Sequence, residues 1–184
     1  MQISLHQHTE TAIVAGGCFW CTEPVFSQLQ GVLQLVSGYI GGHTQNPTYK
    51  AICQGDTGHA EAIQITYDPA QISYDTLLEI FFVSHDPTTL NRQGNDIGTQ
   101  YRSAIFYQDE TQLEIAQGMI SRLNRAQVFD APIVTQLCPA APFYPAEDYH
   151  QQYFAKNPNQ PYCVAVAAPK VAKIRKKYAE LLKG

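Results

Sequence analysis

The chain has 184 residues, of which 45% are hydrophobic, so it can bury one sizeable core and we expect a single domain over residues 1–184. Its net charge of −4 argues against a general attraction to nucleic acid or to anionic membranes, and the basic run 173–177 is too local to change that. Residues 1–8 lack the basic and apolar parts of a signal peptide, and no later run approaches membrane-spanning length, so we expect a cytoplasmic protein, with a monomer as the default.

The first part of the chain has the pattern of a small α+β fold. Apolar runs and alternation predict strands at 11–15, 32–36, 59–67 and 102–107. Helices are expected at 22–30 and from Ser73, a good N-cap residue. The order strand, helix, strand, strand, helix, strand is that of ferredoxin-like folds.

The remaining segments are predicted to be long loops and peripheral elements. Residues 38–58 and 86–100 are rich in turn residues, and loops of this length in a compact domain are usually functional. We further expect a helix at 110–125, a strand at 132–137, a short helix at 146–156 and a final helix at 169–183. The predicted architecture is a ferredoxin-like two-layer α/β sandwich with a mixed sheet, extended loops and a C-terminal tail.

Cys18 lies where the first strand turns into the first helix. Unpaired backbone N–H groups and the helix dipole at such a position favour a thiolate, so Cys18 is a candidate nucleophile. It could equally be a small buried hydrophobe, as most unpaired cysteines are. Five cysteines in a chain of this size do not form the disulfide framework of a small secreted domain, so any disulfide is expected to be transient and catalytic.

The residues after Cys18 offer two further hypotheses. Phe19 and Trp20 can cap the core, or they can form an apolar cup for a methyl or thioether group beside a reactive sulfur. Cys18-x-x-Cys21 has the spacing of thiol–disulfide oxidoreductases and of half a zinc site. Zinc is the weaker hypothesis because no second close Cys/His pair is evident.

Glu61 falls on the apolar face of the predicted strand 59–67, since alternation places it with Ile63, Ile65 and Tyr67. A carboxyl group desolvated there would have a raised pKa and could donate a proton near neutral pH. Alternatively, Glu61 lies in water at the frayed end of the strand. A thiolate beside a protonated carboxyl suits attack on a centre whose oxygen must be protonated, and a sulfoxide is such a centre.

These residues resemble a known family, the A-type peptide methionine sulfoxide reductases. Gly17-Cys18-Phe19-Trp20 resembles the active-site signature of that family. Its other blocks follow in order as Gly38-Tyr39, Gly41-Gly42, Asn46-Pro47-Thr48-Tyr49, Gly58-His59-Ala60-Glu61 and Asp96-x-Gly98-Thr99-Gln100-Tyr101-Arg102-Ser103. The resemblance runs from about residue 11 to residue 163, and several ordered blocks make chance agreement very improbable.

The resemblance implies that Cys18 attacks the sulfoxide sulfur and that Glu61 protonates the oxygen. It also implies that Tyr49, Asp96 and Tyr101 hydrogen-bond around that oxygen or an ordered water, although each of the three could be an ordinary packing, turn or capping residue. Phe19 and Trp20 would hold the methyl group of the substrate. The products would be methionine and a Cys18 sulfenic acid, with the S epimer as substrate and with no metal or other cofactor.

The resemblance also implies a second cysteine and a partner. Cys163 lies in a segment resembling the one that carries the resolving cysteine of the family, although the following residues 164–169 look more strand-like than the usual flexible tail. Cys163 is the first candidate and Cys21, one helical turn from Cys18, is the second, while direct reduction of the sulfenic acid by an external thiol or by another cysteine is the third alternative. A thioredoxin is the expected reductant, and oxidised proteins and free methionine sulfoxide are the expected substrates, in a role of oxidative damage repair.

Two other functions fit part of the pattern. A general thiol–disulfide oxidoreductase could use Cys18 and Cys21, but Glu61 would then have no purpose because disulfide exchange protonates no oxygen. A redox-sensing or metal-binding module without turnover is the third hypothesis.

Overall fold

The computed structural model describes residues 7–184, which form a six-stranded mixed sheet with the strand order β7-β6-β1-β3-β2-β8. The strands are β1 (Glu10–Gly16), β2 (Val32–Ile40), β3 (Ala60–Tyr67), β6 (Ser103–Tyr107), β7 (Gln136–Pro139) and β8 (Phe143–Pro145). Neighbouring strands are antiparallel except β6 and β7, which are parallel. The predicted α+β class with a mixed sheet is confirmed, and the four central strands alternate with two helices in the predicted order.

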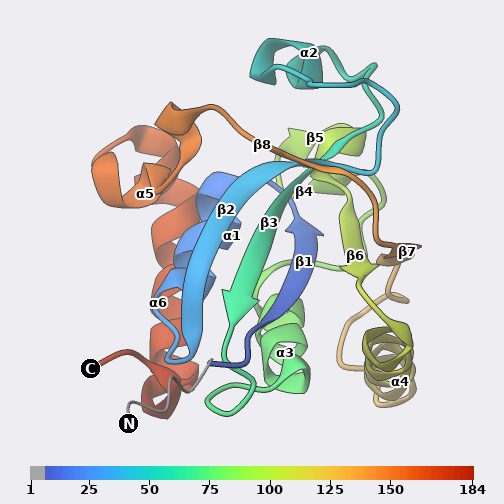
Figure 1. Cartoon of the computed structure of the whole chain (residues 1–184), viewed down its shortest axis with the longest axis vertical. Helices are drawn as coiled ribbons and strands as arrows, with labels where there is room; N and C mark the ends of the chain where they lie inside the picture. The colour runs from blue at the N-terminus through green and yellow to red at the C-terminus, as the bar shows by residue number, and fades with distance from the viewer. Residues whose placement is uncertain (1–6) are drawn as a thin grey trace, which may run out of the picture.

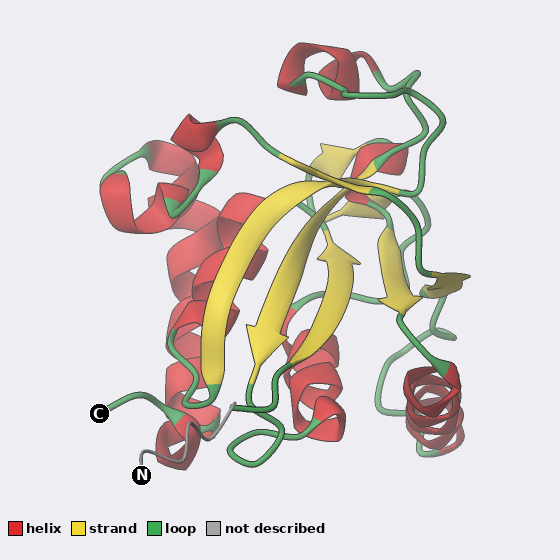
Figure 2. Cartoon of the chain, viewed as in Figure 1, coloured by secondary structure: helices red, strands yellow, loops and turns green. Residues whose placement is uncertain are grey.

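One face of the sheet is covered by helices, as Figures 1 and 2 show. These are α1 (Phe19–Ser27), α3 (Tyr74–Ser84) and α6 (Ala168–Lys177), while α4 (Glu110–Arg125) packs against α3 and β6. Large apolar side chains such as Phe26, Phe81 and Ile65 are fully buried between these helices and the sheet. The first helix begins three residues earlier than predicted, so that Cys18 is its N-cap.

The opposite face carries a smaller core and no helical layer. Ile13, Ile40 and Phe106 from three strands pack against Phe143 and Cys138, which belong to the segment running from β7 to β8. The strand predicted at 132–137 begins only at Gln136, and β8 was not predicted. Its three residues pair with the end of β2 and extend the sheet there.

Both long loops contain structure that the sequence pattern did not predict. The first holds α2 (Tyr49–Gln54), whose N-cap Thr48 accepts a hydrogen bond from the Ala51 N–H at 3.2 Å. The second holds the small hairpin of β4 (Arg92–Gln93) and β5 (Asp96–Ile97), followed by the 3₁₀ turn η1 (Thr99–Tyr101). These elements are too short to produce a recognisable hydrophobic period.

The C-terminal region differs from its prediction in three places, one of which is that the final helix expected at 169–183 ends at Lys177. The helix expected at 146–156 consists of two short pieces, η2 (Asp148–His150) and α5 (Tyr153–Lys156). The strand-like reading of 164–169 is wrong, because the π-helix η3 (Cys163–Ala167) leads directly into α6. Cys163 and Ala167 are fully buried but Ala165 between them is exposed, which fits a helical spacing of four residues, since a strand would place all three on one face. The chain then makes the short turn η4 (Ala179–Leu181).

The unpredicted elements gather at one end of the sheet. Figure 1 shows α2, β4, β5 and α5 around the end at which β1 finishes, and α1 begins just after that point. In residues 7–184, no helix is both long enough and apolar enough to cross a membrane.

Candidate functional site

Cys18 is held at the start of α1 by a tight turn. Gly17 has φ +98°, and a Cβ there would lie 2.7 Å from the side chain of Gln93, so only glycine fits both the conformation and the space. The Cys18 carbonyl accepts hydrogen bonds from the N–H groups of Cys21 at 3.0 Å and Thr22 at 3.3 Å. The turn therefore fixes the Cys18 backbone while leaving its side chain half-buried.

Glu61 is buried next to this turn, and not in water at a frayed strand end. Glu61 is 1% exposed, and its Oε1 accepts a hydrogen bond from the Phe19 N–H at 3.2 Å. Burial raises the pKa of Glu61 to about 8, with the nearby Asp96 carboxylate adding to the effect. The carboxyl group is therefore largely protonated at neutral pH.

The Cys18 thiol does not have the low pKa expected from its place at a helix N-terminus. Burial raises the pKa of Cys18 well above its ordinary value, and Glu61 and Cys21 add to the increase. The hydrogen bond from the Trp20 backbone acts in the predicted direction, but it is outweighed. Without substrate, Cys18 is therefore a protonated thiol.

The three polar residues implied by the resemblance lie around Glu61 on separate elements. Tyr49 opens α2, Tyr101 closes η1 and Asp96 begins β5. Burial raises the pKa of Tyr49 and of Tyr101, and the Glu61 carboxyl contributes to both increases. Two neutral phenols and two carboxyl groups thus converge on one region beside the Cys18 thiol.

Phe19 and Trp20 have different environments. The Phe19 ring is buried, with its centroid 5.8 Å from that of Tyr39. Trp20 is half-buried and stacks on Tyr153 of α5, with ring centroids 3.8 Å apart and an interplanar angle of 7°. Its indole N–H donates to Nδ1 of His150 at 3.0 Å. Trp20 is therefore the more accessible of the two rings beside the thiol.

The segment before Cys163 closes one side of the site. The Tyr162 hydroxyl donates to Asp96 Oδ2 at 2.5 Å and accepts from the Cys21 thiol at 3.5 Å. Cys21 and Cys163 are both buried. Sequence reasoning missed Tyr162 and His150, and the only available signal for Tyr162 was its place next to a candidate cysteine.

An open cavity of about 340 Å³ lies beside the thiol. Its wall includes Cys18, Asp96, Tyr162 and Lys170, so the sequence-predicted nucleophile faces solvent-accessible space. Cys18 and Asp96 are the predicted site residues that line this cavity, whereas Glu61, Tyr49 and Tyr101 do not.

Residues 10–182 match the family model described as peptide methionine sulfoxide reductase. The chain belongs to this family. A relative from Chromobacterium violaceum, peptide methionine sulfoxide reductase MsrA, is 60% identical over 173 residues, covering 94% of this chain and 98% of the relative. The resemblance inferred from the ordered sequence blocks is confirmed, and the chain is an enzyme that reduces methionine sulfoxide.

Solved structures of the family have the same fold. Methionine sulfoxide reductase A of Corynebacterium diphtheriae gives a TM-score of 0.73 at 40% identity, over 83% of this chain and 76% of that chain. Mxr1 from Saccharomyces cerevisiae in reduced form gives a TM-score of 0.77 at 36% identity, over 84% of this chain and 89% of that chain. Mxr1 has also been solved in complex with Trx2, and that structure gives a TM-score of 0.55 at 23% identity, over 83% of this chain and 89% of that chain.

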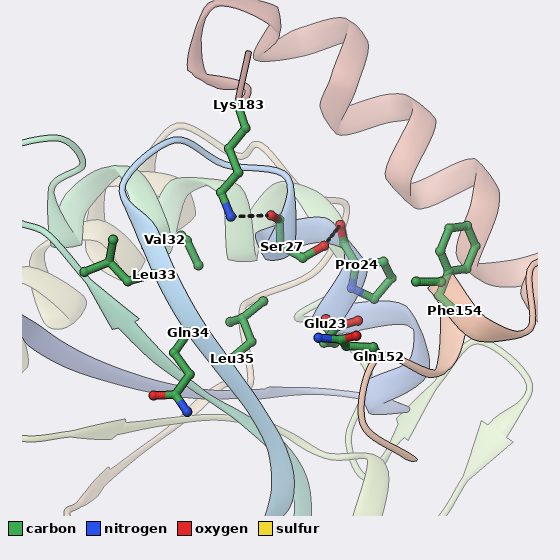
Figure 3. Close-up of a pocket in the computed structure, with 11 residues that line it drawn as sticks. Glu23, Pro24, Ser27, Val32, Leu33, Gln34, Leu35, Gln152, Phe154 and Lys183 are labelled. Atoms are coloured by element: carbon green, nitrogen blue, oxygen red, sulfur yellow. Dashed lines mark hydrogen bonds between the residues drawn. The ribbon is translucent and has the colours of Figure 1, made fainter. Parts of the chain in front are cut away.

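A second cavity, of about 460 Å³, lies between α1, β2 and α5. Figure 3 shows Glu23 beside this cavity, with Leu35 and Phe154 also at its wall. Glu23 is 7% exposed, and burial raises its pKa to about 7. None of the predicted catalytic residues lines this cavity. Because burial of Glu23 disfavours its charged form, the protonation of Glu23 changes the free energy of unfolding.

The raised pKa of Glu23 predicts a pH-dependent effect on stability. The folded state binds the proton more tightly than the unfolded state, so the stability contributed by protonation is complete below the unfolded pKa and is lost as the pH rises through about 7. We expect the Glu23→Gln variant to gain stability relative to the parent between pH 4 and pH 8, by up to about 3 kcal/mol. Urea unfolding at several pH values measures this gain, and a difference that is constant with pH would contradict it.

Proposed function

We propose that the chain reduces methionine-S-sulfoxide, in proteins and as the free amino acid, by attack of the Cys18 sulfur on the sulfoxide sulfur. The observation that carries the proposal is Glu61, a protonated carboxyl group buried against the first turn of α1. Disulfide exchange or thiol sensing has no use for a proton donor at this position. Sulfoxide reduction requires one, because the leaving oxygen is a poor anion.

In the proposed step, the Cys18 sulfur forms a bond to the sulfoxide sulfur while Glu61 gives its proton to the oxygen. The oxygen then leaves the substrate sulfur and ends on Cys18 as a sulfenic acid. The substrate sulfur gains two electrons and becomes a thioether, and Cys18 loses two. The thiol proton of Cys18 replaces the one that Glu61 has lost, so no external acid is consumed and no metal or other cofactor takes part.

The neighbouring side chains suit the developing charge. Tyr49 and Tyr101 remain neutral phenols because burial raises the pKa of each, so both can donate hydrogen bonds to the sulfoxide oxygen. Asp96 orients the Tyr162 hydroxyl and raises the pKa of Glu61. Trp20, with Phe19 behind it, offers the apolar surface for the methyl group of the substrate.

Regeneration of Cys18 uses a second cysteine, and the geometry favours Cys21 for the first disulfide. Cys21 follows Cys18 by one helical turn of α1, whereas Cys163 lies on a separate element, in the first turn of the continuous helix η3–α6. Burial raises the pKa of Cys21 and the neighbouring Cys163 adds to the increase, so Cys163 lies close enough to attack the Cys21 sulfur afterwards and release the Cys18 thiol. We propose a thioredoxin-type reductant for the final step, in line with the complex of the yeast relative with Trx2. In the cytoplasm such a cycle repairs oxidised proteins.

The reaction is tested by supplying purified protein with dithiothreitol and each epimer of N-acetyl-methionine sulfoxide, and following methionine formation by chromatography. We expect turnover of the S epimer only, and at least a 10³-fold loss in Cys18→Ser because the nucleophile is removed. Cys138→Ser, which changes a half-buried cysteine of β7 packed in the small core on the other face of the sheet, serves as a control and should retain activity. No turnover of either epimer by folded, reduced protein would refute the proposed function.

The resolving cysteine is tested by a single turnover without reductant. Cys21→Ser is expected to accumulate a Cys18 sulfenic acid that dimedone traps, because the nearest thiol is missing. Cys163→Ser is expected to form the Cys18–Cys21 disulfide at the rate of the parent, as seen by mass spectrometry of peptides. The opposite pattern, trapping in Cys163→Ser alone, would assign the first disulfide to Cys163.

A further inference from the structure

Trp20 is held on two sides by residues that follow β8. Tyr153 stacks flat against the indole ring, with centroids 3.8 Å apart. His150 accepts the indole N–H at 3.0 Å, and its ring centroid lies 5.8 Å from that of Trp20. Stacking alone lets a flat ring slide or rotate in its own plane, whereas a hydrogen bond at its edge fixes that rotation.

The protonation state of His150 follows from this contact. An indole nitrogen can only donate, so Nδ1 of His150 must be an unprotonated acceptor and Nε2 carries the ring proton. His150 is 1% exposed, and Nε2 has no hydrogen-bond partner among residues 7–184. A buried donor without a partner is costly, so the hydrogen bond at Nδ1 and the packing around the ring together hold this orientation.

Those surroundings are aromatic and come from three elements. The His150 centroid lies 5.1 Å from that of Phe19, 4.4 Å from Tyr49 and 4.0 Å from Tyr149. Glu147 is the nearby charged group, and its carboxylate is already engaged by the Tyr39 hydroxyl and the Tyr49 N–H, both at 3.0 Å. Burial lowers the pKa of His150, although Glu147 acts in the opposite direction. His150 is therefore a neutral acceptor at physiological pH.

We infer that His150 is a positioning residue that fixes the Trp20 indole as the surface on which the methyl group of the substrate rests. The inference rests on the proposed function for the identity of the substrate. Among the described residues, the hydrogen bond of His150 goes to Trp20 and its ring packs against other aromatic rings, which assigns it a positioning role. The hydrogen bond holds the indole in one orientation before the substrate arrives. Its loss therefore weakens substrate binding and leaves the chemical step intact.

The experiment compares steady-state kinetics and Trp20 emission in variants of the full chain. Trp20 is the only tryptophan, so intrinsic fluorescence reports on this indole alone. His150→Leu removes the acceptor, and His150→Asn keeps an oxygen near the position of Nδ1. We expect His150→Leu to raise KM for the S epimer about five- to tenfold with kcat within about twofold of the parent, and to shift the Trp20 emission. We expect His150→Asn to keep both KM and emission close to the parent.

His150→Asn is the matched control, because it removes the imidazole ring and its packing while keeping an acceptor for the indole N–H. A folded His150→Leu variant with parental KM and emission would overturn the inference. Equal losses in the Leu and Asn variants would assign the effect to packing and would also overturn it.

A measurement on the parent needs no variant. Two-bond ¹H–¹⁵N NMR correlations of histidine are expected to show His150 as the neutral Nε2–H tautomer, and an Nδ1–H or doubly protonated ring would contradict the inference. If the parent reduces neither epimer, the proposed function fails, while the tautomer and the emission still test the Trp20–His150 contact.

Discussion

The hydrogen bond from the Phe19 N–H to the buried Glu61 carboxyl joins the first turn of α1 to β3, in the middle of the sheet. Taking a carboxyl group out of water is costly if it is ionised, so the fold keeps Glu61 protonated and raises its pKa to about 8. The same burial keeps the Cys18 thiol protonated. The Cys18 thiol and the Glu61 carboxyl group are therefore both protonated before the reaction. In the proposed step, the sulfoxide oxygen takes up the proton of Glu61.

This arrangement changes the usual account of a cysteine at a helix N-terminus. The helix dipole and the Trp20 N–H do favour a thiolate, but desolvation and the neighbouring Glu61 act more strongly in the opposite direction. Among residues 7–184, the groups with the largest effects on the pKa of Cys18 include no cationic side chain. Reactivity thus depends on the acid that protonates the sulfoxide and less on a thiolate formed in advance.

The sequence allowed the central strands and the helices α1, α3 and α4 to be predicted, because each has an apolar period long enough to recognise. The sequence also predicted two site residues. Cys18 was predicted from its place at a turn, and Glu61 from the alternation of side chains along β3. The short elements α2, β5 and η1 could not be predicted, since they are held by caps and by tertiary contacts. The residues after Cys163 were misassigned because their small apolar side chains fit a buried helix as well as a strand.

The contacts of the C-terminal segment lay beyond sequence reasoning. Trp20, His150 and Tyr153 meet across more than a hundred residues, and no local pattern indicates that a histidine would accept the indole N–H. Tyr162 meets Asp96 and Cys21 in the same way. These contacts depend on how the C-terminal segment packs against α1, and they place Tyr162 beside Asp96 and Cys21.

The pKa of Glu61 is the most direct test of this account. It can be measured by ¹³C NMR of glutamate side-chain carboxyl carbons across a pH titration, with the Glu61→Gln variant identifying the signal. Titration near pH 8, with the carboxyl protonated at neutral pH, is the predicted result. Ionisation near the ordinary value of 4.5 would mean that Glu61 is a carboxylate at neutral pH, and it would contradict its role as the proton donor.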